Sequence, residues 1–410
     1  MRFERLDDAF SAAMKGKVLS ETYVDFERCW GPRARLALDT IEGKTTGGIP
    51  IWLVHVMDIP FIEQLTGHAP GDFARDPDAV YLAFQRHAGV CYIDQYIPDN
   101  PLTMGPAGHE QNAPRTITTG AGVAEVDGIR IDSPEAVIEH MERFVFPRRE
   151  EKLRTFDPEE PAVIRRLIDQ ECAVQRRFGF DLLKGPYADG FQSFPIFHNY
   201  VYGYENYFMA YALYPEVMEK DFAQAADLAV LENKAAARAI VEGGLPPLVR
   251  LDYDMADSRS TLVDIASLDR IWFPHLARAI APFREAGVRL IWHCDGNLMQ
   301  MVPRLIEVGI SGFQGFQYED GMDYERICRM TDRDGRPLFI IAGVSVTRTL
   351  PRGSRQDVVD EMKWLVRHGP RAGFMLGASS SVVPGTPRTN IEAMIEGFNH
   401  YRRHGRRGLM

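Results

Sequence analysis

The sequence is poor in cysteine and has no long apolar run. Its five cysteines are Cys29, Cys91, Cys172, Cys294 and Cys328, with no CxxC pair among them. An odd and scattered set of this kind argues against a disulfide framework and predicts reduced thiols in the cytoplasm. No window approaches the roughly 18 consecutive apolar residues of a membrane helix. The N-terminal sequence MRFERLDDAF carries acids where a secretory signal needs an apolar core, so we expect neither a membrane span nor export.

The sequence also lacks an excess of positive charge. It has 47 Lys and Arg against 57 Asp and Glu, a formal net charge of −10. Because phosphate binding needs a basic surface, this balance argues against nucleic acid or an anionic membrane as the main partner. Arginines do cluster at the end of the chain, in Tyr401–Arg407 (YRRHGRR). We interpret that cluster as a solvated tail.

Short β-rich apolar runs recur along the chain, each followed by a turn and a helical pattern. This alternation is typical of parallel βα units. The runs are Ile49–Val56, Val90–Ile97, Gly190–Phe197, Leu248–Ala256, Arg289–Cys294, Ile310–Gln317, Leu338–Val344 and Gly373–Ala378. They predict an α/β fold of the (β/α)8 TIM-barrel type over residues 46–410, with a helical extension at 1–45. Pro195 makes the third run the poorest strand.

Helical stretches separate these runs, and one segment interrupts the repeat. The expected helices are Pro161–Phe178, Pro215–Glu242, Leu268–Ala286, Leu298–Val308, Ser354–His368 and Thr389–Arg403. Residues 99–132 do not fit the repeat, and the alternation around Asp127-Gly128 predicts a β-hairpin inserted after the second strand.

Polar side chains gather where the predicted strands end. In barrels of this type the active site lies at the carboxyl ends of the strands. The candidate substrate-binding residues there are His55, Tyr96, His198, Tyr200, Tyr204, Glu205, Gln317 and Ser379. The candidates for catalysis or metal binding are Asp252, Asp254, His293, Asp295 and Glu319.

The sequence RLIWHCDGN places His293 and Asp295 at the end of a strand. Alternate residues of an extended chain share a face, so these two side chains should face the interior while Cys294 packs behind them. His and Asp together can bind zinc, or the carboxylate can orient the imidazole for acid–base chemistry. A purely structural pairing with the following turn is the alternative. Asp252 and Asp254 likewise share a face, and could hold a metal or a proton or form an ion-pair network with Arg250.

From Leu248 to Tyr401 the chain resembles the uroporphyrinogen decarboxylase superfamily, which also contains the cobalamin-dependent methyltransferases and folds as a (β/α)8 barrel. The matching motifs are LDYDMADSRSTL, HCDGN, MVPRLIEVGISGFQ, YEDGMD, IAGVS, LPRGSRQDVVDEM and GFMLGASSSVVPGTPRTNIEAM. True uroporphyrinogen decarboxylases carry an Arg-Gln-Ala-Gly-Arg motif after the first strand. This chain has VMDIPFIEQ there, so we do not expect porphyrinogen decarboxylation.

The resemblance is greatest to the branch that removes methyl groups from methoxylated compounds. The thiol-methylating branch binds zinc through His-x-Cys and a second cysteine after the last strand. Here Asp295 stands in the first cysteine position, and Ala378 and Ser379 surround the second. A harder donor set favours oxygen ligands over thiols. A Lewis acid or proton donor at the ether oxygen would help that oxygen to leave.

The resemblance therefore implies a methyltransferase component that demethylates a small, aromatic methoxylated compound and passes the methyl group to a corrinoid protein. Zinc would be held by His293 and Asp295, with Asp254 or Glu319 as a further ligand, and the aromatic segment around Tyr200 would line the substrate pocket. Cobalamin would come from the partner protein. Related barrels form homodimers.

Two alternatives remain open. The first is a metal-free decarboxylase or lyase of the uroporphyrinogen decarboxylase type, acting on a small carboxylated substrate. In it Asp295, Asp252 or Asp254 would manage protons while His293 orients the substrate. The second is a barrel that binds a small molecule or a partner without catalysis.

Overall fold

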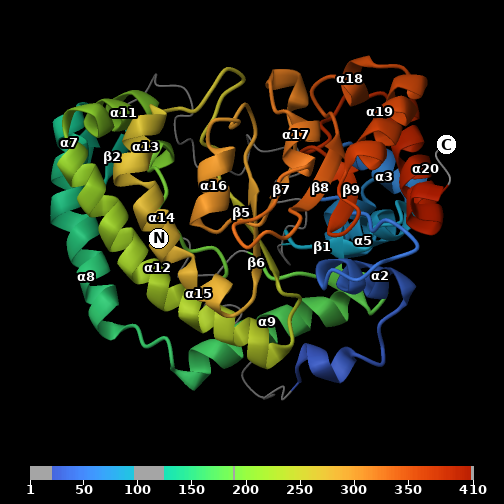
Figure 1. Cartoon of the computed structure of the whole chain (residues 1–410), viewed down its shortest axis with the longest axis horizontal. Coiled ribbons are helices and arrows are strands. Elements are labelled where there is room, and N and C mark those ends of the chain that lie inside the picture. The colour runs from blue at the N-terminus through green and yellow to red at the C-terminus, as the bar shows by residue number, and fades with distance from the viewer. Residues whose placement is uncertain (1–20, 97–123, 188–189, 408–410) are drawn as a thin grey trace.

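The computed structural model describes residues 21–96, 124–187 and 190–407 (Figure 1). Its centre is a five-stranded parallel sheet in which neighbouring strands follow chain order. The strands are β5 (Leu248–Asp252), β6 (Arg289–His293), β7 (Gly312–Gln314), β8 (Phe339–Val344) and β9 (Phe374–Ala378). They lie within the last five predicted runs. Because every pairing is parallel, their carboxyl ends meet at one end of the sheet.

Shorter pairings continue the sheet beyond β9. Ile51 bridges Leu376 of β9, and Trp52 bridges Tyr92 in parallel. Tyr92 belongs to β1 (Tyr92–Ile93), which pairs with β4 (Leu183–Lys184), also in parallel. The fold is therefore a mixed α/β fold built on parallel strands.

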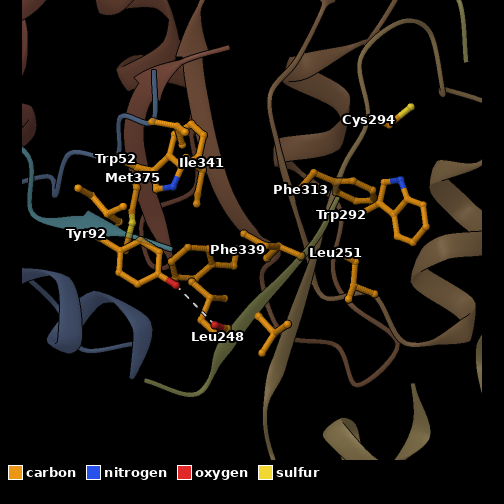
Figure 2. Packing of buried hydrophobic residues seen from close by; sticks show 14 of the residues in the cluster. Trp52, Tyr92, Leu248, Leu251, Trp292, Cys294, Phe313, Phe339, Ile341 and Met375 are labelled. Carbon is orange, nitrogen blue, oxygen red and sulfur yellow. Dashed lines mark hydrogen bonds between the residues drawn. The ribbon is translucent and has the colours of Figure 1, made fainter. Parts of the chain in front are cut away.

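Among the described residues no ladder joins β4 to β5, so the predicted closed barrel is not confirmed there. Side chains meet the exposed edge of β5 instead. The Tyr92 hydroxyl donates to the carbonyl of Leu248 at 3.5 Å (Figure 2). The Gln192 amide donates to the carbonyl of Arg250 at 2.7 Å. Backbone acceptors that a neighbouring strand would satisfy are thus bonded to side chains.

The predicted strand Gly190–Phe197 is wrong. The segment forms no strand, and the strand of this unit lies earlier, at β4. Pro195 has no N–H for a ladder, and its carbonyl accepts from the Trp272 indole at 3.0 Å. The Tyr253 hydroxyl takes the N–H of Phe197 at 2.6 Å. Side chains therefore satisfy this backbone in an irregular conformation.

Helices surround the sheet (Figure 1). They are η1 (Tyr23–Phe26), α2 (Pro32–Ile41), α3 (Ile59–Leu65), α4 (Asp72–Arg75), α5 (Pro77–His87), α7 (Pro134–His140), η2 (Met141–Val145), α8 (Phe146–Thr155), α9 (Pro161–Phe178), α10 (Asn199–Tyr202), α11 (Tyr204–Leu213), α12 (Pro215–Gly243), α13 (Ile265–Ile271), α14 (Phe273–Ala279), α15 (Ala281–Glu285), α16 (Val302–Val308), η3 (Tyr318–Asp320), α17 (Tyr324–Cys328), α18 (Thr349–Arg352), α19 (Arg355–His368), α20 (Arg388–His404) and η4 (Gly405–Arg407). No helix in the described ranges is long and apolar enough to cross a membrane.

Proline and glycine set several of these boundaries. Helix α9 begins at Pro161, as predicted, and ends before Gly179, whose φ of 73° suits glycine. The single helix predicted over 268–286 is instead divided into α13, α14 and α15. Pro274 and Pro282 lie in the first turns of the second and third of these. A proline cannot donate to the preceding turn, so the helix restarts at each one.

A β-hairpin forms at the predicted Asp127-Gly128 turn. Strands β2 (Ala124–Val126) and β3 (Ile129–Ile131) pair in antiparallel register. Asp127 and Gly128 take φ values of 50° and 78°, as a tight hairpin turn requires. The rest of the predicted insertion, 97–123, and residues 1–20 of the N-terminal extension lie outside the described residues.

The terminal arginines do not form a solvated tail, which corrects the interpretation from sequence. They lie in the last turn of α20 and in η4. The Arg406 guanidinium donates to the carbonyls of Gly369 at 3.1 Å and Pro370 at 2.5 Å. Its bonds fasten the end of the chain to the loop that precedes β9.

Candidate metal and substrate site

Three potential ligands meet at the carboxyl ends of β5 and β6. Atoms of Asp254, His293 and Asp295 lie within 4.8 Å of one another. The strand register explains this, because Asp252 pairs with His293 and the two aspartates follow two residues later on each chain segment. The backbone N–H of Asp295 donates to Asp254 Oδ1 at 2.7 Å, which joins the two strand ends.

The hydrogen bond of His293 sets its tautomer. Its Nδ1 lies 3.2 Å from the carbonyl oxygen of Gln314, at the end of β7. A carbonyl oxygen can only accept, so Nδ1 is the donor, and in the neutral ring Nε2 is the nitrogen with the lone pair. Gly315, with φ of 69°, leaves room for the ring, since a Cβ there would lie 3.0 Å from Nδ1. This arrangement is typical of metal-binding histidines, whose second ring nitrogen is held by an acceptor.

Asp295 is held on both carboxylate oxygens. Oδ1 accepts from the Gln317 amide at 3.2 Å and Oδ2 from the Ser380 hydroxyl at 3.3 Å. Burial raises the pKa of Asp295, and the nearby carboxylate of Asp254 adds to the rise, while His293 opposes it. A partly buried carboxylate beside a second carboxylate and an imidazole favours a bound cation. The donor set fits zinc, which accepts histidine nitrogen and carboxylate oxygen.

Asp252 belongs to a different, structural network. Arg250 is 2% exposed and forms ion pairs of 2.7 Å with both Asp94 and Asp252. Tyr187 donates to Asp252 at 2.9 Å. Burial opposes ionisation of Asp252, but Arg250, His293 and the Tyr187 bond lower its pKa to about 2. The carboxylate is therefore ionised, and its Oδ1 lies 3.9 Å from His293 Nε2.

Of the two proposed third ligands, Asp254 is in the cluster and Glu319 is not. Glu319 accepts from the Ser345 hydroxyl at 2.5 Å and from Thr347. It thereby fastens the segment that follows β8. Gln317, predicted to bind substrate, contacts Asp295 and also accepts from the N–H of Gly296 at 2.6 Å. Gln317 therefore holds the candidate ligand Asp295 from the segment that follows β7.

Ser379 and His55 are buried beside this centre. The Ser379 hydroxyl accepts from the N–H of Val346 at 3.1 Å, and its carbonyl accepts from the Gln314 amide at 3.2 Å. His55 Nδ1 lies 3.1 Å from the Ser381 hydroxyl. Both residues support the strand ends around β9.

The aromatic segment lies near Asp254. Tyr200 and Tyr204 are 52% and 44% exposed. Burial raises the pKa of Tyr253, and Tyr200, Tyr204 and Asp254 are all close enough to raise it further. Glu205 is exposed on the same segment. Two exposed tyrosines thus lie near Tyr253, the residue that precedes the candidate ligand Asp254.

His198 and Tyr96 are engaged elsewhere. His198 Nε2 lies 3.4 Å from Asp221 and 3.2 Å from the Arg149 guanidinium, so it belongs to an ion network between α8 and α12. The Tyr96 hydroxyl donates to Asp78 on α5 at 2.5 Å. The structure does not bring either side chain into the cluster of three ligands.

Cys294 packs behind the site, as the alternation along the strand predicts. Its sulfur accepts from the N–H of Met255 at 3.2 Å, and its thiol donates to the Asp295 carbonyl at 3.0 Å. Burial raises its pKa, so the thiol stays protonated. In Figure 2 it lies on the side of Trp292, away from Ile341.

Asp94 and Tyr187 are the residues that sequence reasoning missed. Asp94 lies at the end of the second predicted run, two residues before Tyr96, but only Tyr96 is among the candidate site residues predicted from the sequence. Tyr187 follows β4, which begins at Leu183. The sequence prediction put this strand at 190–197, seven residues too late. A correct strand assignment would have placed Tyr187 near the carboxyl ends.

Residues 201–401 match the family described as Uroporphyrinogen decarboxylase (URO-D). The match covers 201 of the 410 residues and shows that this part of the chain is similar to the URO-D family. The matched segment contains all five strands of the main sheet and the three clustered ligands. The resemblance inferred from the sequence motifs is therefore confirmed.

Solved structures also resemble this chain. A methyltransferase from Methanosarcina mazei matches 90% of this chain and 98% of its own at a TM-score of 0.53 and 14% identity. At that identity the likeness shows a common fold. A B12-independent methionine synthase from Shewanella sp. W3-18-1, in complex with selenomethionine, matches 45% of this chain and 56% of its own, with a TM-score of 0.27 and 14% identity. No curated protein matches the chain.

Proposed function

We propose that the protein is a methyltransferase component that demethylates a small, aromatic methoxylated compound and passes the methyl group to a corrinoid protein. The observation that carries the proposal is the cluster of Asp254, His293 and Asp295, whose potential ligand atoms lie within 4.8 Å of one another while Gln314 holds the imidazole at Nδ1. These three residues would hold zinc. A zinc ion there would supply a Lewis acid for the ether oxygen of the substrate.

The residues of the chain have separate tasks in this reaction. Gln317 and Ser380 hold the carboxylate of Asp295, while Gln314 holds the imidazole of His293. The exposed ring faces of Tyr200 and Tyr204 beside Asp254 would contact a flat aromatic group. In the transfer, the bond between methyl carbon and ether oxygen would break and the oxygen would leave as phenoxide with the bonding pair, while the reduced corrinoid of the partner would supply the electron pair for the new bond to the methyl carbon.

A second candidate is a metal-free decarboxylase or lyase acting on a small carboxylated substrate. The raised pKa of Asp295 favours it, because a carboxyl that retains its proton can act as a general acid. In this account Asp295 gives its proton to the substrate, and His293, next to the ionised Asp252, orients it.

A turnover assay separates the two. Purified protein is incubated without oxygen with methoxybenzoates and reduced cobalamin, and release of the free phenol is measured by chromatography. We expect release by the wild type and by the control His275→Ala, which changes a partly buried histidine on α14, but none by His293→Ala. Phenol release by His293→Ala would contradict the proposal. Release of CO2 from a carboxylated substrate by metal-free protein would instead support the second candidate.

A further inference from the structure

A cavity of about 550 Å³ lies at the end of the sheet opposite the candidate metal site. Its walls come from residues 44–49, which precede the first strand position, from 371–374 at the start of β9, and from 405–407 after α20. The candidate site lies beyond the other end of β9, where Ser380 contacts Asp295. At ~3.3 Å per residue the two are about 20 Å apart.

The lining of this cavity is cationic in a chain that is acidic overall. Lys44, Arg371, Arg406 and Arg407 line it, and no aspartate or glutamate of the described residues does. The chain as a whole carries a formal charge of −10. A fifth cation stands just behind the wall, since a Cβ on Gly373 would lie 3.3 Å from the Arg289 guanidinium. Positive charge is therefore concentrated here against the general balance.

Two of the four lining cations already have protein partners. Lys44 forms ion pairs with Asp39 at 2.9 Å and Glu42 at 2.5 Å. Arg406 donates to backbone carbonyls of the segment before β9 and lies over the Phe374 ring at 5.0 Å. These contacts fix the walls of the cavity.

Arg371 and Arg407 are different. Neither forms an ion pair or a side-chain hydrogen bond with the described part of the chain, and both are exposed. Burial lowers the pKa of Arg406, and the charge of Arg371 lowers it further. The like charges of Arg371 and Arg406 thus face one cavity, and no acid from the described part of the chain lines it between them. A bound anion would relieve that repulsion.

Backbone donors add to this set. The N–H groups of residues 45–48 donate no backbone hydrogen bond within the described ranges. The hydroxyl of Thr46 is turned back onto the Gly48 carbonyl at 2.9 Å. Since exposed peptide N–H groups and guanidinium forks are the donors that phosphate oxygens use in proteins, the lining matches phosphate chemistry.

We propose that this cavity binds a small anion that carries more than one phosphate group. The two unpaired guanidiniums come from separate wall segments and can take separate phosphates. The volume falls within the roughly 300–1,000 Å³ range of small-molecule sites. The ligand would contact residues 44–49, residues 371–374 at the start of β9 and residues 405–407 after α20. The site is independent of the methyl-transfer reaction.

Calorimetric titration of the full-length protein tests this inference. The probes are inorganic pyrophosphate and adenosine diphosphate, each at constant ionic strength. We expect saturable binding to the wild type, weakened at least about tenfold in Arg371→Gln and in Arg407→Gln, because each loses charge-assisted hydrogen bonds. The matched control is Arg352→Gln, which removes an exposed arginine of α18 outside the cavity and should bind within about twofold of the wild type.

The outcomes are distinguishable. Tighter binding of adenosine diphosphate than of pyrophosphate identifies a nucleotide as the ligand, and the reverse order identifies a free polyphosphate. Each supports a polyphosphate site, provided that the unfolding temperatures of the variants match the wild type. No saturable binding of either probe below about 10 mM, or equal weakening in Arg352→Gln, would overturn the inference.

Discussion

The Nδ1 atom of His293 and the backbone carbonyl of Gln314 lie 3.2 Å apart, across the β6–β7 pairing. Because the acceptor belongs to the backbone, rotation of the Gln314 side chain does not release the ring. The imidazole stands in the cluster with Asp254 and Asp295, and the rest of the candidate site depends on its orientation.

Gly315→Ala should displace this ring. A Cβ at residue 315 would lie 2.6 Å from the carbonyl oxygen of Ser379 and 3.0 Å from His293 Nδ1, at a φ of 69°. We expect a loss of about 2 kcal/mol in the free energy of unfolding together with weaker metal binding. Gly335→Ala is the control, because its φ is 79° and nothing lies near its Cβ. Urea unfolding and zinc titration measure both effects, and equal losses in the two variants would contradict the account.

Arg250→Met should destabilise the protein strongly. The substitution leaves the buried carboxylate of Asp94 without its guanidinium partner. Removing one partner of a buried ion pair costs about 3–5 kcal/mol. Arg259→Met, which breaks an exposed pair with Asp257, should cost less than about 1 kcal/mol. Urea denaturation provides the comparison, and similar values for the two variants would show that the network contributes little.

Asp295→Asn should stabilise the metal-free protein at neutral pH. Burial, with Asp254 nearby, raises the pKa of Asp295 in the folded state above that of the unfolded chain. The folded state then retains a proton that the unfolded chain has released, so this contribution to stability is present at low pH and is lost as pH rises through the folded pKa. The amide of the Asp295→Asn variant does not titrate, so the variant does not lose this stability as pH rises.

The measurement is the free energy of unfolding of both proteins in the presence of a metal chelator, at about pH 4 and about pH 7. We expect the variant to gain about 1 kcal/mol over the wild type at the higher pH and less at the lower. Saturating zinc should reverse the order at pH 7, because only the wild type retains the full ligand set. A difference that does not change with pH would count against the raised pKa.

The sequence predicted the second half of the fold better than the first. The strands β5 to β9 are continuous buried runs bounded by glycine turns, so their period and length identify them. The strands of the first half pair only through single bridges, such as that of Trp52 with Tyr92, and through two-residue strands such as β1. Strands this short leave no alternation of apolar and polar residues that could be recognised in the sequence. The run at 190–197 contains the buried residues Phe191 and Phe197, so it resembles a strand in sequence. Its backbone is hydrogen-bonded to side chains and not to a neighbouring strand.

The candidate site was predictable where alternation along a strand decides it. His293, Asp295 and Cys294 take the faces that a period of two assigns. The third candidate ligand, Asp254 or Glu319, could be chosen only from the pairing register of β5 with β6, which places Asp254 next to Asp295. The sequence alone does not give this register. The role of Arg250 also required the structure, because its partner Asp94 lies 156 residues away along the chain.

The most direct test of the account is the metal content of purified protein, measured by elemental mass spectrometry. The variants are Asp254→Ala and Asp295→Ala, with Glu319→Gln and Cys294→Ala as controls that leave the three ligands in place. We predict one zinc per chain in the wild type and in both controls, and its loss from the two aspartate variants. Full zinc content in Asp254→Ala and Asp295→Ala, or none in the wild type, would contradict the assignment of this cluster as the metal site.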